Sequence, residues 1–253
     1  MNNTLAGRRV LVVGGTSGFG FRVAQLALEA GAEVIITGRN LERRMLAFAK
    51  LKEFDASLQS KAQSNLHLQC EQLDASDPSS LAPFFETVGP IDHLVSMAGG
   101  AMGGGFIDAP LDVIRRAIDE KFVANLRLAR FAAPCLRDGG SIVFTAGSGG
   151  RPHTASGAIV GNDAIRTLVQ GLAVELAPQH RVNAVAPTWT RTPLWRDLPA
   201  AEADAIEARF SQQIPLKRTA TIDEVASAYL FLMGNGFING QTLAVDGGVT
   251  LTS

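Results

Sequence analysis

A glycine-rich turn near the N-terminus holds the first residues whose types and spacing could do chemistry. Residues 14–20 read GGTSGFG and follow the apolar run Val10–Val13. In a turn from a strand into a helix, Gly14 permits the tight bend, Gly18 lets the backbone approach a pyrophosphate, and Gly20 allows close helix–strand packing. The amides at the helix N-terminus would bind the phosphates. The turn therefore predicts a dinucleotide site, with an ordinary loop as the alternative.

The type of dinucleotide depends on Arg39, which lies 19 residues after Gly20. In dinucleotide-binding folds this is where a residue meets the adenine ribose. An acidic residue would accept from the 2′-hydroxyl of NAD, whereas an arginine offers a planar cationic fork to the 2′-phosphate of NADP. Against this, Ser17 stands before Gly18 where a second basic residue would strengthen the case, and Arg39 could simply be solvated. We expect NADP, with NADPH preferred over NADH.

The glycine turn and later motifs together resemble the short-chain dehydrogenase/reductase family along nearly the whole chain. The later motifs are Leu73-Asp74-Ala75, Ser96-Met97-Ala98-Gly99, RVNAVAP at 181–187, Thr192-Pro193 and Val245-Asp246-Gly247-Gly248. Two departures are Ser96-Met97, where the family has Asn-Asn, and Thr188, where it has glycine. The resemblance implies a nicotinamide cofactor and a small-molecule substrate. It implies cofactor contacts from Gly14, Thr16, Ser17, Gly18, Phe19, Gly20, Arg39, Asn40, Asp74, Ala75, Ala98, Gly99, Pro187, Thr188, Thr190 and Thr192.

The same resemblance shows that the catalytic residues expected in this family are missing. The family protonates its substrate with a Tyr-x-x-x-Lys pair, in which the lysine lowers the pKa of the tyrosine. At the matching positions this chain has Ala158 and Asn162. Its only tyrosine is Tyr229, followed four residues later by Met233. Ala158 donates no proton, and Asn162 can hydrogen-bond a ribose hydroxyl but carries no charge.

Lys121 is the first candidate to replace the missing acid. It stands where the family has an asparagine in its long central helix, so one lysine is lost at position 162 and another is gained. A partly desolvated ammonium could act as an acid or polarise a carbonyl. The alternatives are that it fills the volume and charge of the lost lysine, or that it is a surface lysine paired with Glu120 or Asp119.

Other candidates are two hydroxyls and a histidine. The family serine falls at Gly147, and Thr145 and Ser148 are the nearest hydroxyls, although both could instead satisfy loop backbone. His153 titrates near neutral pH, five residues before Ala158, but a loop histidine is commonly just exposed to water. The proposed catalytic set is Lys121, Ser148, Thr145, His153 and Asn162.

These residues must be positioned by alternating strands and helices. Short apolar runs predict strands at Val10–Val13, Glu33–Thr37, His67–Gln72, His93–Ser96, Ser141–Thr145, Val182–Val185 and Thr242–Val245. Helical periodicity predicts helices at Phe19–Glu29, Leu111–Leu136, Ile159–Leu176 and Asp223–Leu232, with one or two surface helices in Leu41–Asn65. The alternation favours an α/β fold, a single Rossmann-like domain over residues 1–253 with a doubly wound parallel sheet of about seven strands.

Composition excludes several functional classes. A net charge of −1 gives no electrostatic basis for binding nucleic acid or an anionic membrane. No apolar run approaches the roughly 20 residues of a membrane span, and the N-terminus has no signal-peptide core. Cys70 and Cys135 are far apart, which favours reduced thiols in a cytoplasmic protein, and no spacing suggests a metal site.

Residues 188–215 are expected to form a substrate lid. Trp189, Trp195, Phe210 and Met102 could line an apolar pocket or could be ordinary packing. Two functions remain open. The first is an NADP(H)-dependent oxidoreductase acting on a small, apolar carbonyl, alcohol or enone with a non-standard proton donor. The second is a catalytically silent NADP-binding sensor or assembly protein. Family relatives are commonly tetramers, so a homotetramer or homodimer is expected.

Overall fold

The computed structural model describes residues 5–58 and 68–252 and contains one parallel seven-stranded sheet. The strands lie in the order β3-β2-β1-β4-β5-β6-β7, so the chain reverses direction across the sheet between β1 and β4. They are β1 (Arg9–Val13), β2 (Glu33–Gly38), β3 (Leu68–Gln72), β4 (Ile91–Ser96), β5 (Leu136–Thr145), β6 (Arg181–Pro187) and β7 (Thr242–Val245). All seven predicted strands are present with small changes of bounds; His67 lies outside the described residues. The doubly wound fold is confirmed.

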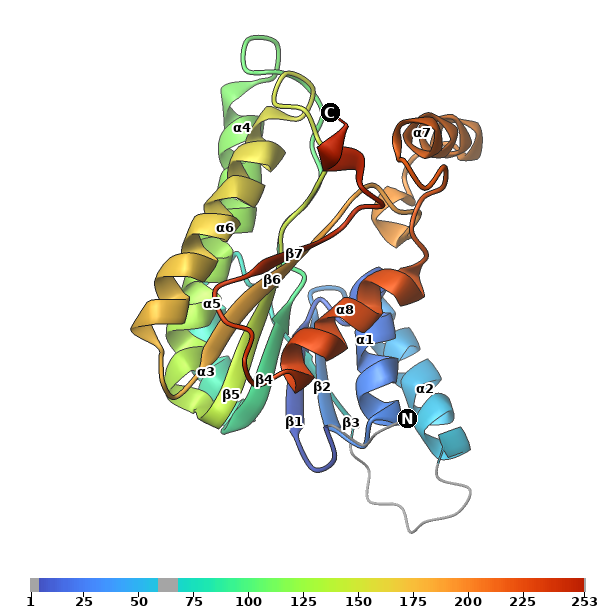
Figure 1. Cartoon of the computed structure of the whole chain (residues 1–253). Helices are drawn as coiled ribbons and strands as arrows, with labels where there is room; N and C mark the ends of the chain where they lie inside the picture. Colours follow the sequence, from blue (N-terminus) through green and yellow to red (C-terminus); the bar gives the residue numbers. More distant parts are fainter. Residues whose placement is uncertain (1–4, 59–67, 253) are drawn as a thin grey trace.

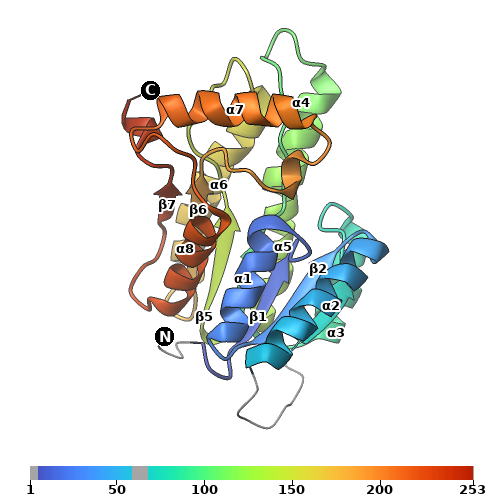
Figure 2. The ribbon, with the colours of Figure 1, turned by 90° about the vertical axis from the view of Figure 1, so that its right-hand side faces the viewer.

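Helices cover both faces of the sheet (Figure 1). On one face lie α1 (Gly18–Glu29), α2 (Leu41–Leu58) and α8 (Ile222–Gly234), and on the other α3 (Pro78–Val88), α4 (Leu111–Ile118), α5 (Ala124–Ala132) and α6 (Ser156–Glu175). A further helix, α7 (Ala200–Gln213), lies across one end of the molecule (Figure 2). Sequence periodicity did not predict α3 or α7. Within Leu41–Asn65 the described residues form α2 alone.

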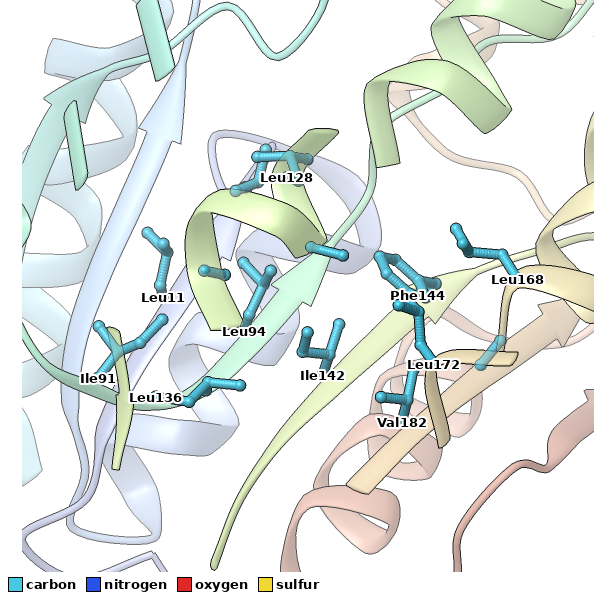
Figure 3. Packing of buried hydrophobic residues seen from close by; sticks show 14 of the residues in the cluster. Leu11, Ile91, Leu94, Leu128, Leu136, Ile142, Phe144, Leu168, Leu172 and Val182 are labelled. Carbon is cyan, nitrogen blue, oxygen red and sulfur yellow. The ribbon is translucent and has the colours of Figure 1, made fainter. Parts of the chain in front are cut away.

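Two apolar cores flank the sheet, one on each face. Along β1, Val10 and Val12 belong to one buried cluster, whereas Leu11 and Val13 belong to the other. Figure 3 shows the second cluster, where side chains from β1, β4 and β5 pack against α5 and α6. Because successive strand residues point to opposite faces and both faces are covered, β1 is apolar from Val10 to Val13, whereas β4 and β5 also carry buried polar residues such as His93 and Ser141.

The predicted helical stretch Leu111–Leu136 is present as one uninterrupted helical run over residues 111–135, and Leu136 begins β5. The run is not α-helical throughout: a five-residue π-helix at Asp119–Val123 lies between α4 and α5, and a 3-10 turn at Ala133–Cys135 ends it. A π-helix inserts an extra residue into a helical turn and is found frequently at functional sites. Lys121 lies at its centre. The sequence period does not reveal the insertion, because one extra residue leaves the apolar spacing on either side intact.

Three expectations about other site types concern the described residues only. Over residues 5–58 and 68–252, no helix is long and apolar enough to cross a bilayer. No group of three or more potential metal-binding side chains is found within the same ranges. Cys70 and Cys135 are both free thiols.

Candidate functional site

A cavity of about 520 Å³ opens at the carboxyl ends of the parallel strands. Its walls come from the segments after β1, β2, β3, β4, β5 and β6, together with the π-helix, the start of α6, most of residues 187–196, and Phe210. The reversal of strand order between β1 and β4 is where open α/β sheets leave a ligand crevice. Every residue that the sequence predicted to contact the cofactor, from Gly14 to Thr192, lines this cavity.

The glycine turn has the geometry of a phosphate loop. Gly14 and Gly18 adopt positive φ angles of 81° and 55°, a region that favours glycine. A Cβ on Gly20 would lie 2.4 Å from the Gly14 carbonyl oxygen, so only glycine fits there. Ser17 is the N-cap of α1, but its side chain makes no capping hydrogen bond. The first amides of α1 are therefore left without a side-chain cap, which suits a bound phosphate.

Two arginines border the cavity beside the end of β2. Arg39 follows β2, and Arg43 lies in the first turn of α2; both are exposed. Within the described ranges, neither has a carboxylate within ion-pairing distance. Asn40 also lines the cavity, but its side chain accepts from the Arg43 amide at 2.8 Å and so caps α2. Arg43 is a second basic residue that sequence reasoning sought at position 17 and missed, because it lies on a different element.

Lys121 is the buried cation of the site. Its side chain is 8% exposed and lines the cavity. Two glycines leave the space that its side chain occupies. A Cβ on Gly99 would lie 2.4 Å from Lys121 Cδ, and one on Gly161 would lie 2.9 Å from Lys121 Cβ. Burial lowers the pKa of the Lys121 amine to about 8. Neither Glu120 nor any other acid in the described part of the chain pairs with it, so the expectation of a surface ion pair is wrong.

Asn125 holds the π-helix against the end of β4. Its side-chain amide donates to the Lys121 carbonyl and, at 3.3 Å, to the Ala98 carbonyl. Its oxygen accepts from Ser96 Oγ at 2.6 Å. Asn125 is fully buried, and these bonds satisfy its polar groups. Asn125 was not among the residues predicted for the site; the signal that could have pointed to it is Ser96 at the end of β4.

Asn162 occupies the space that a serine side chain at position 147 would need. A Cβ on Gly147 would lie 2.4 Å from Asn162 Nδ2. Asn162 and the neighbouring Ala158 both line the cavity, so the missing Tyr-x-x-x-Lys pair corresponds to positions that do face the site. The two departures, glycine at 147 and asparagine at 162, are therefore sterically linked.

The Ser148 hydroxyl lines the cavity as an acceptor only. Its Oγ donates to the Asp246 carboxylate at 2.7 Å. Hydrogen bonds from Ser148, the Gly248 amide and Thr250, acting against burial, keep the pKa of Asp246 low. An ionised carboxylate accepts and cannot donate, so the single hydroxyl proton of Ser148 is committed. Ser148 therefore does not donate to a substrate carbonyl, contrary to the sequence-based expectation.

Thr145 lines the cavity, but its hydroxyl proton is used within the protein. Its Oγ1 donates to the Ser96 carbonyl at 2.7 Å and lies 2.7 Å from the Tyr229 hydroxyl. Since the single Thr145 proton goes to Ser96, Tyr229 is the donor in the second bond. Burial raises the pKa of Tyr229, so the only tyrosine is a neutral core residue. The structure does not support Thr145 as a proton donor.

His153 does not join the site. Its side chain is exposed, in the loop before α6, and it is not among the residues that line the cavity. The backbone just after His153 is held by the Gly104–Ala155 bridge and by Ser156, whose hydroxyl donates to the Gly104 carbonyl. The expectation that His153 assists catalysis is therefore not met in this structure.

An aromatic wall faces the cavity beyond Thr188. Trp189 stacks on Trp195 and on Phe210, each with ring centroids 5.9 Å apart. Trp195 is fixed by a 3.1 Å hydrogen bond from its indole nitrogen to the Thr190 carbonyl. With Met102, these are the four residues predicted to line an apolar pocket, and all four line the cavity. Phe210 belongs to α7, so the helix that the sequence missed supplies part of this wall.

Comparison with known proteins agrees with this architecture. The family model described as Enoyl-(Acyl carrier protein) reductase matches residues 13–250. Short-chain dehydrogenase/reductase fsr5 from Gibberella fujikuroi is 34% identical over 260 residues, covering 98% of this chain and 96% of that protein. A solved small-chain dehydrogenase in complex with NADPH is 30% identical with a TM-score of 0.76, covering 97% of this chain and 99% of the other. MalC Reductase/Diels-Alderase from Malbranchea aurantiaca has 27% identity and a TM-score of 0.85 over 98% of both chains. The chain belongs to the short-chain dehydrogenase/reductase family of oxidoreductases.

Proposed function

We propose that this protein is an NADP(H)-dependent oxidoreductase that reduces a small, largely apolar carbonyl compound or enone, with the Lys121 ammonium in place of the family tyrosine. The observation that carries this proposal is the buried Lys121 amine, which lines the cavity without a carboxylate partner in residues 5–58 and 68–252. A charge kept in such a place at a cost in stability is typical of a functional group.

The choice of NADPH over NADH rests on Arg39 and Arg43. Both border the cavity at the carboxyl end of β2, and both are free of described carboxylates. Two guanidinium groups at this position suit a 2′-phosphate, whereas a 2′-hydroxyl would leave them without an anionic partner. The NADPH complex of the similar small-chain dehydrogenase supports the same cofactor type.

Lys121 would act at the oxygen of the reacting carbonyl. When bound, NADPH supplies the hydride for the carbonyl carbon. As the π electrons move onto oxygen, the Lys121 ammonium stabilises the developing charge and transfers a proton to it, becoming a neutral amine that solvent reprotonates. For an enone, the hydride would go to the β-carbon and the same proton to the enolate oxygen. A pKa of about 8 keeps Lys121 protonated at pH 7 while easing proton release.

The remaining polar groups would orient the substrate. Asn162 can donate its amide to a ribose or substrate oxygen, and Ser148 can accept from a substrate donor. The stacked Trp189, Trp195 and Phe210 would exclude water from one side and favour an apolar or flat substrate. We propose that residues 188–215 act as the lid over this site, and that the single domain works as a cytoplasmic homotetramer or homodimer.

Two measurements test the proposal. Fluorescence titration should give tighter binding of NADPH than of NADH. NADPH oxidation should then be screened against a panel of carbonyls and enones with wild type, Lys121→Met, and Lys52→Met as a control exposed on α2. Lys121→Met should lower kcat/KM by about 100- to 10,000-fold, the range of general acid catalysis, with the NADPH Kd unchanged. Lys52→Met should match wild type.

The pH dependence of the reaction gives a second criterion. The reactive form of Lys121 is the ammonium, so wild-type kcat/KM for reduction should be level below about pH 8 and fall about tenfold per pH unit above it. A profile that is level through pH 9 would remove Lys121 as the acid, even if turnover is found.

A silent NADP-binding role is the alternative function, and it is supported by the small number of acidic groups among the proposed catalytic residues. Thr145 and Ser148 have committed their protons, Asn162 is neutral, and His153 does not line the cavity. Lys121 is therefore the one acidic group of the proposed catalytic set that lines the cavity. A silent NADP-binding sensor or assembly protein needs none of them. NADPH binding with no oxidation across the whole panel would favour that alternative. Failure to bind either nucleotide would overturn both proposals.

A further inference from the structure

Arg196 lies between the aromatic wall and the glycine turn. It follows the 3-10 turn Pro193–Trp195, and its Nη2 donates to Ser17 Oγ at 3.3 Å. The same segment contacts the turn at Gly18, where a Cβ would lie 3.5 Å from Thr192 Cβ and 3.6 Å from Pro193 Cδ. Arg196 also lines the cavity. The lid segment therefore places a guanidinium directly beside the phosphate loop.

The charge of Arg196 has no anionic partner in the described part of the chain. Its other hydrogen bond, from Nε, goes to the Pro193 carbonyl. Arg191, five residues earlier, differs in this respect: its guanidinium pairs with Asp204 and Glu207 of α7. Arg191 does not line the cavity, whereas Arg196 does. Of the two arginines in this segment, Arg191 is therefore already paired with carboxylates. Arg196 lines the cavity without an anionic partner in the described residues.

Ser17 is the second half of this arrangement. It is the N-cap of the twelve-residue helix α1, yet its hydroxyl makes no capping bond and instead accepts from Arg196. The amides of the first helical turn and the Arg196 guanidinium consequently meet at one point of the cavity wall. Amides and a guanidinium together are donors suited to two phosphate groups, and neither suits a neutral ligand as well.

We propose that Arg196 binds the pyrophosphate of the dinucleotide and thereby couples cofactor binding to the position of residues 189–196. This inference rests on the proposed function. In this structure Arg196 donates to the Ser17 hydroxyl. A bound diphosphate, being an anion, is the stronger acceptor and takes over the guanidinium. The aromatic wall carried by the same segment is then held in place by the cofactor, so substrate meets a formed wall after cofactor has bound.

The chain provides its own reporter for this coupling. Its two tryptophans, Trp189 and Trp195, both lie in this segment. Tryptophan emission therefore reports on residues 189–196 with no contribution from the rest of the molecule. A ligand without nicotinamide avoids quenching of that emission by energy transfer to the reduced ring.

The experiment compares two nucleotide fragments by calorimetry and by tryptophan emission. Adenosine 2′-monophosphate carries only the 2′-phosphate, whereas 2′-phosphoadenosine 5′-diphosphoribose also carries the diphosphate. The variants are Arg196→Gln, Arg196→Lys and, as the matched control from the same segment, Arg191→Gln. Arg196 is exposed, so its replacement leaves the core intact.

Arg196→Gln should weaken the diphosphoribose ligand about tenfold, as expected for one charge-assisted hydrogen bond, and leave adenosine 2′-monophosphate unchanged. Arg196→Lys should fall between wild type and Arg196→Gln. The emission change caused by the diphosphoribose ligand should be lost in Arg196→Gln and kept in Arg191→Gln.

Equal weakening of both ligands by Arg196→Gln, or equal effects of the two glutamine variants, would overturn the inference while leaving the proposed function standing. Wild type that binds neither fragment nor NADPH would overturn the proposed function and this inference together.

Discussion

The cofactor end and the chemistry end of the cavity are built on different principles. The proposed cofactor end is built mainly from backbone shape: the positive φ angles of Gly14 and Gly18 and the uncapped start of α1. The chemistry end is built from side chains of separate elements, above all Lys121 on the π-helix and Asn162 on α6. The backbone-built end keeps the family pattern, and the side-chain-built end departs from it. One side chain can be exchanged without disturbing a strand–turn–helix, whereas an exchange within the turn distorts its backbone.

The largest effect on cofactor affinity should come from removing the two cations of the proposed cofactor end. The double variant Arg39→Ala/Arg43→Ala loses two charge-assisted contacts to a 2′-phosphate, so the NADPH Kd should rise at least about 100-fold. The NADH Kd should change less than about threefold, because a 2′-hydroxyl does not need them. Fluorescence titration measures both constants. Parallel loss of both cofactors would mean that these arginines maintain the fold of the adenine end and do not select the cofactor.

The chemistry end should respond in the opposite sense, gaining stability when its cation is removed. The pKa of Lys121 is about 8 in the folded chain, against 10.5 for a free lysine. At pH 7 the ammonium is charged in both states and burial disfavours it only in the folded one. Lys121→Met should therefore raise the free energy of unfolding by about 3 kcal/mol.

The pH dependence of the free energy of unfolding tests whether the buried charge of Lys121 causes this gain in stability. Between about pH 8 and 10.5 the folded lysine releases its proton before the unfolded one, so wild-type stability rises with pH. The advantage of Lys121→Met should shrink across that window. Urea denaturation of both proteins at pH 7 and pH 9.5 measures the difference. A variant less stable than wild type at pH 7 would indicate an anionic partner for Lys121.

A smaller effect should test whether the replacements at the chemistry end depend on each other. Gly147→Ser should cost about 1 kcal/mol, because the new Cβ would lie 2.4 Å from Asn162 Nδ2 and must displace that side chain. In the Asn162→Ala background the same change should cost less by at least about 0.5 kcal/mol. A double-mutant cycle by urea denaturation gives the coupling. Additive costs would show that positions 147 and 162 changed independently.

The same contrast explains what the sequence could predict. The strands, the glycine turn and Arg39 follow from local rules, since strand alternation and turn conformation are set within a few residues. The roles of Ser148 and Thr145 do not, because they depend on Asp246 and Tyr229, which lie 98 and 84 residues away in the chain. The π-helix that carries Lys121 rests on Asn125, Ala98 and Ser96 across two elements. Long-range hydrogen bonds decide which hydroxyl is free to act on a substrate, and a local sequence pattern does not predict them.

The smallest expected effect concerns the only tyrosine. Tyr229 is fully buried on α8 and donates to Thr145 Oγ1 at 2.7 Å. Tyr229→Phe removes that bond but keeps the ring and the bond from Thr145 to Ser96, so the cost in stability should be about 1 kcal/mol.

Turnover should stay within about twofold of wild type, because the chemistry end works without a tyrosine. Thermal denaturation and NADPH oxidation by Tyr229→Phe measure the two quantities. If stability is retained and turnover is lost, the proton path runs through Thr145 to Tyr229. Lys121 would then be a buried charge with no part in the proton transfer. In that case the chemistry end would still depend on a tyrosine, but on one at position 229 in place of one at position 158.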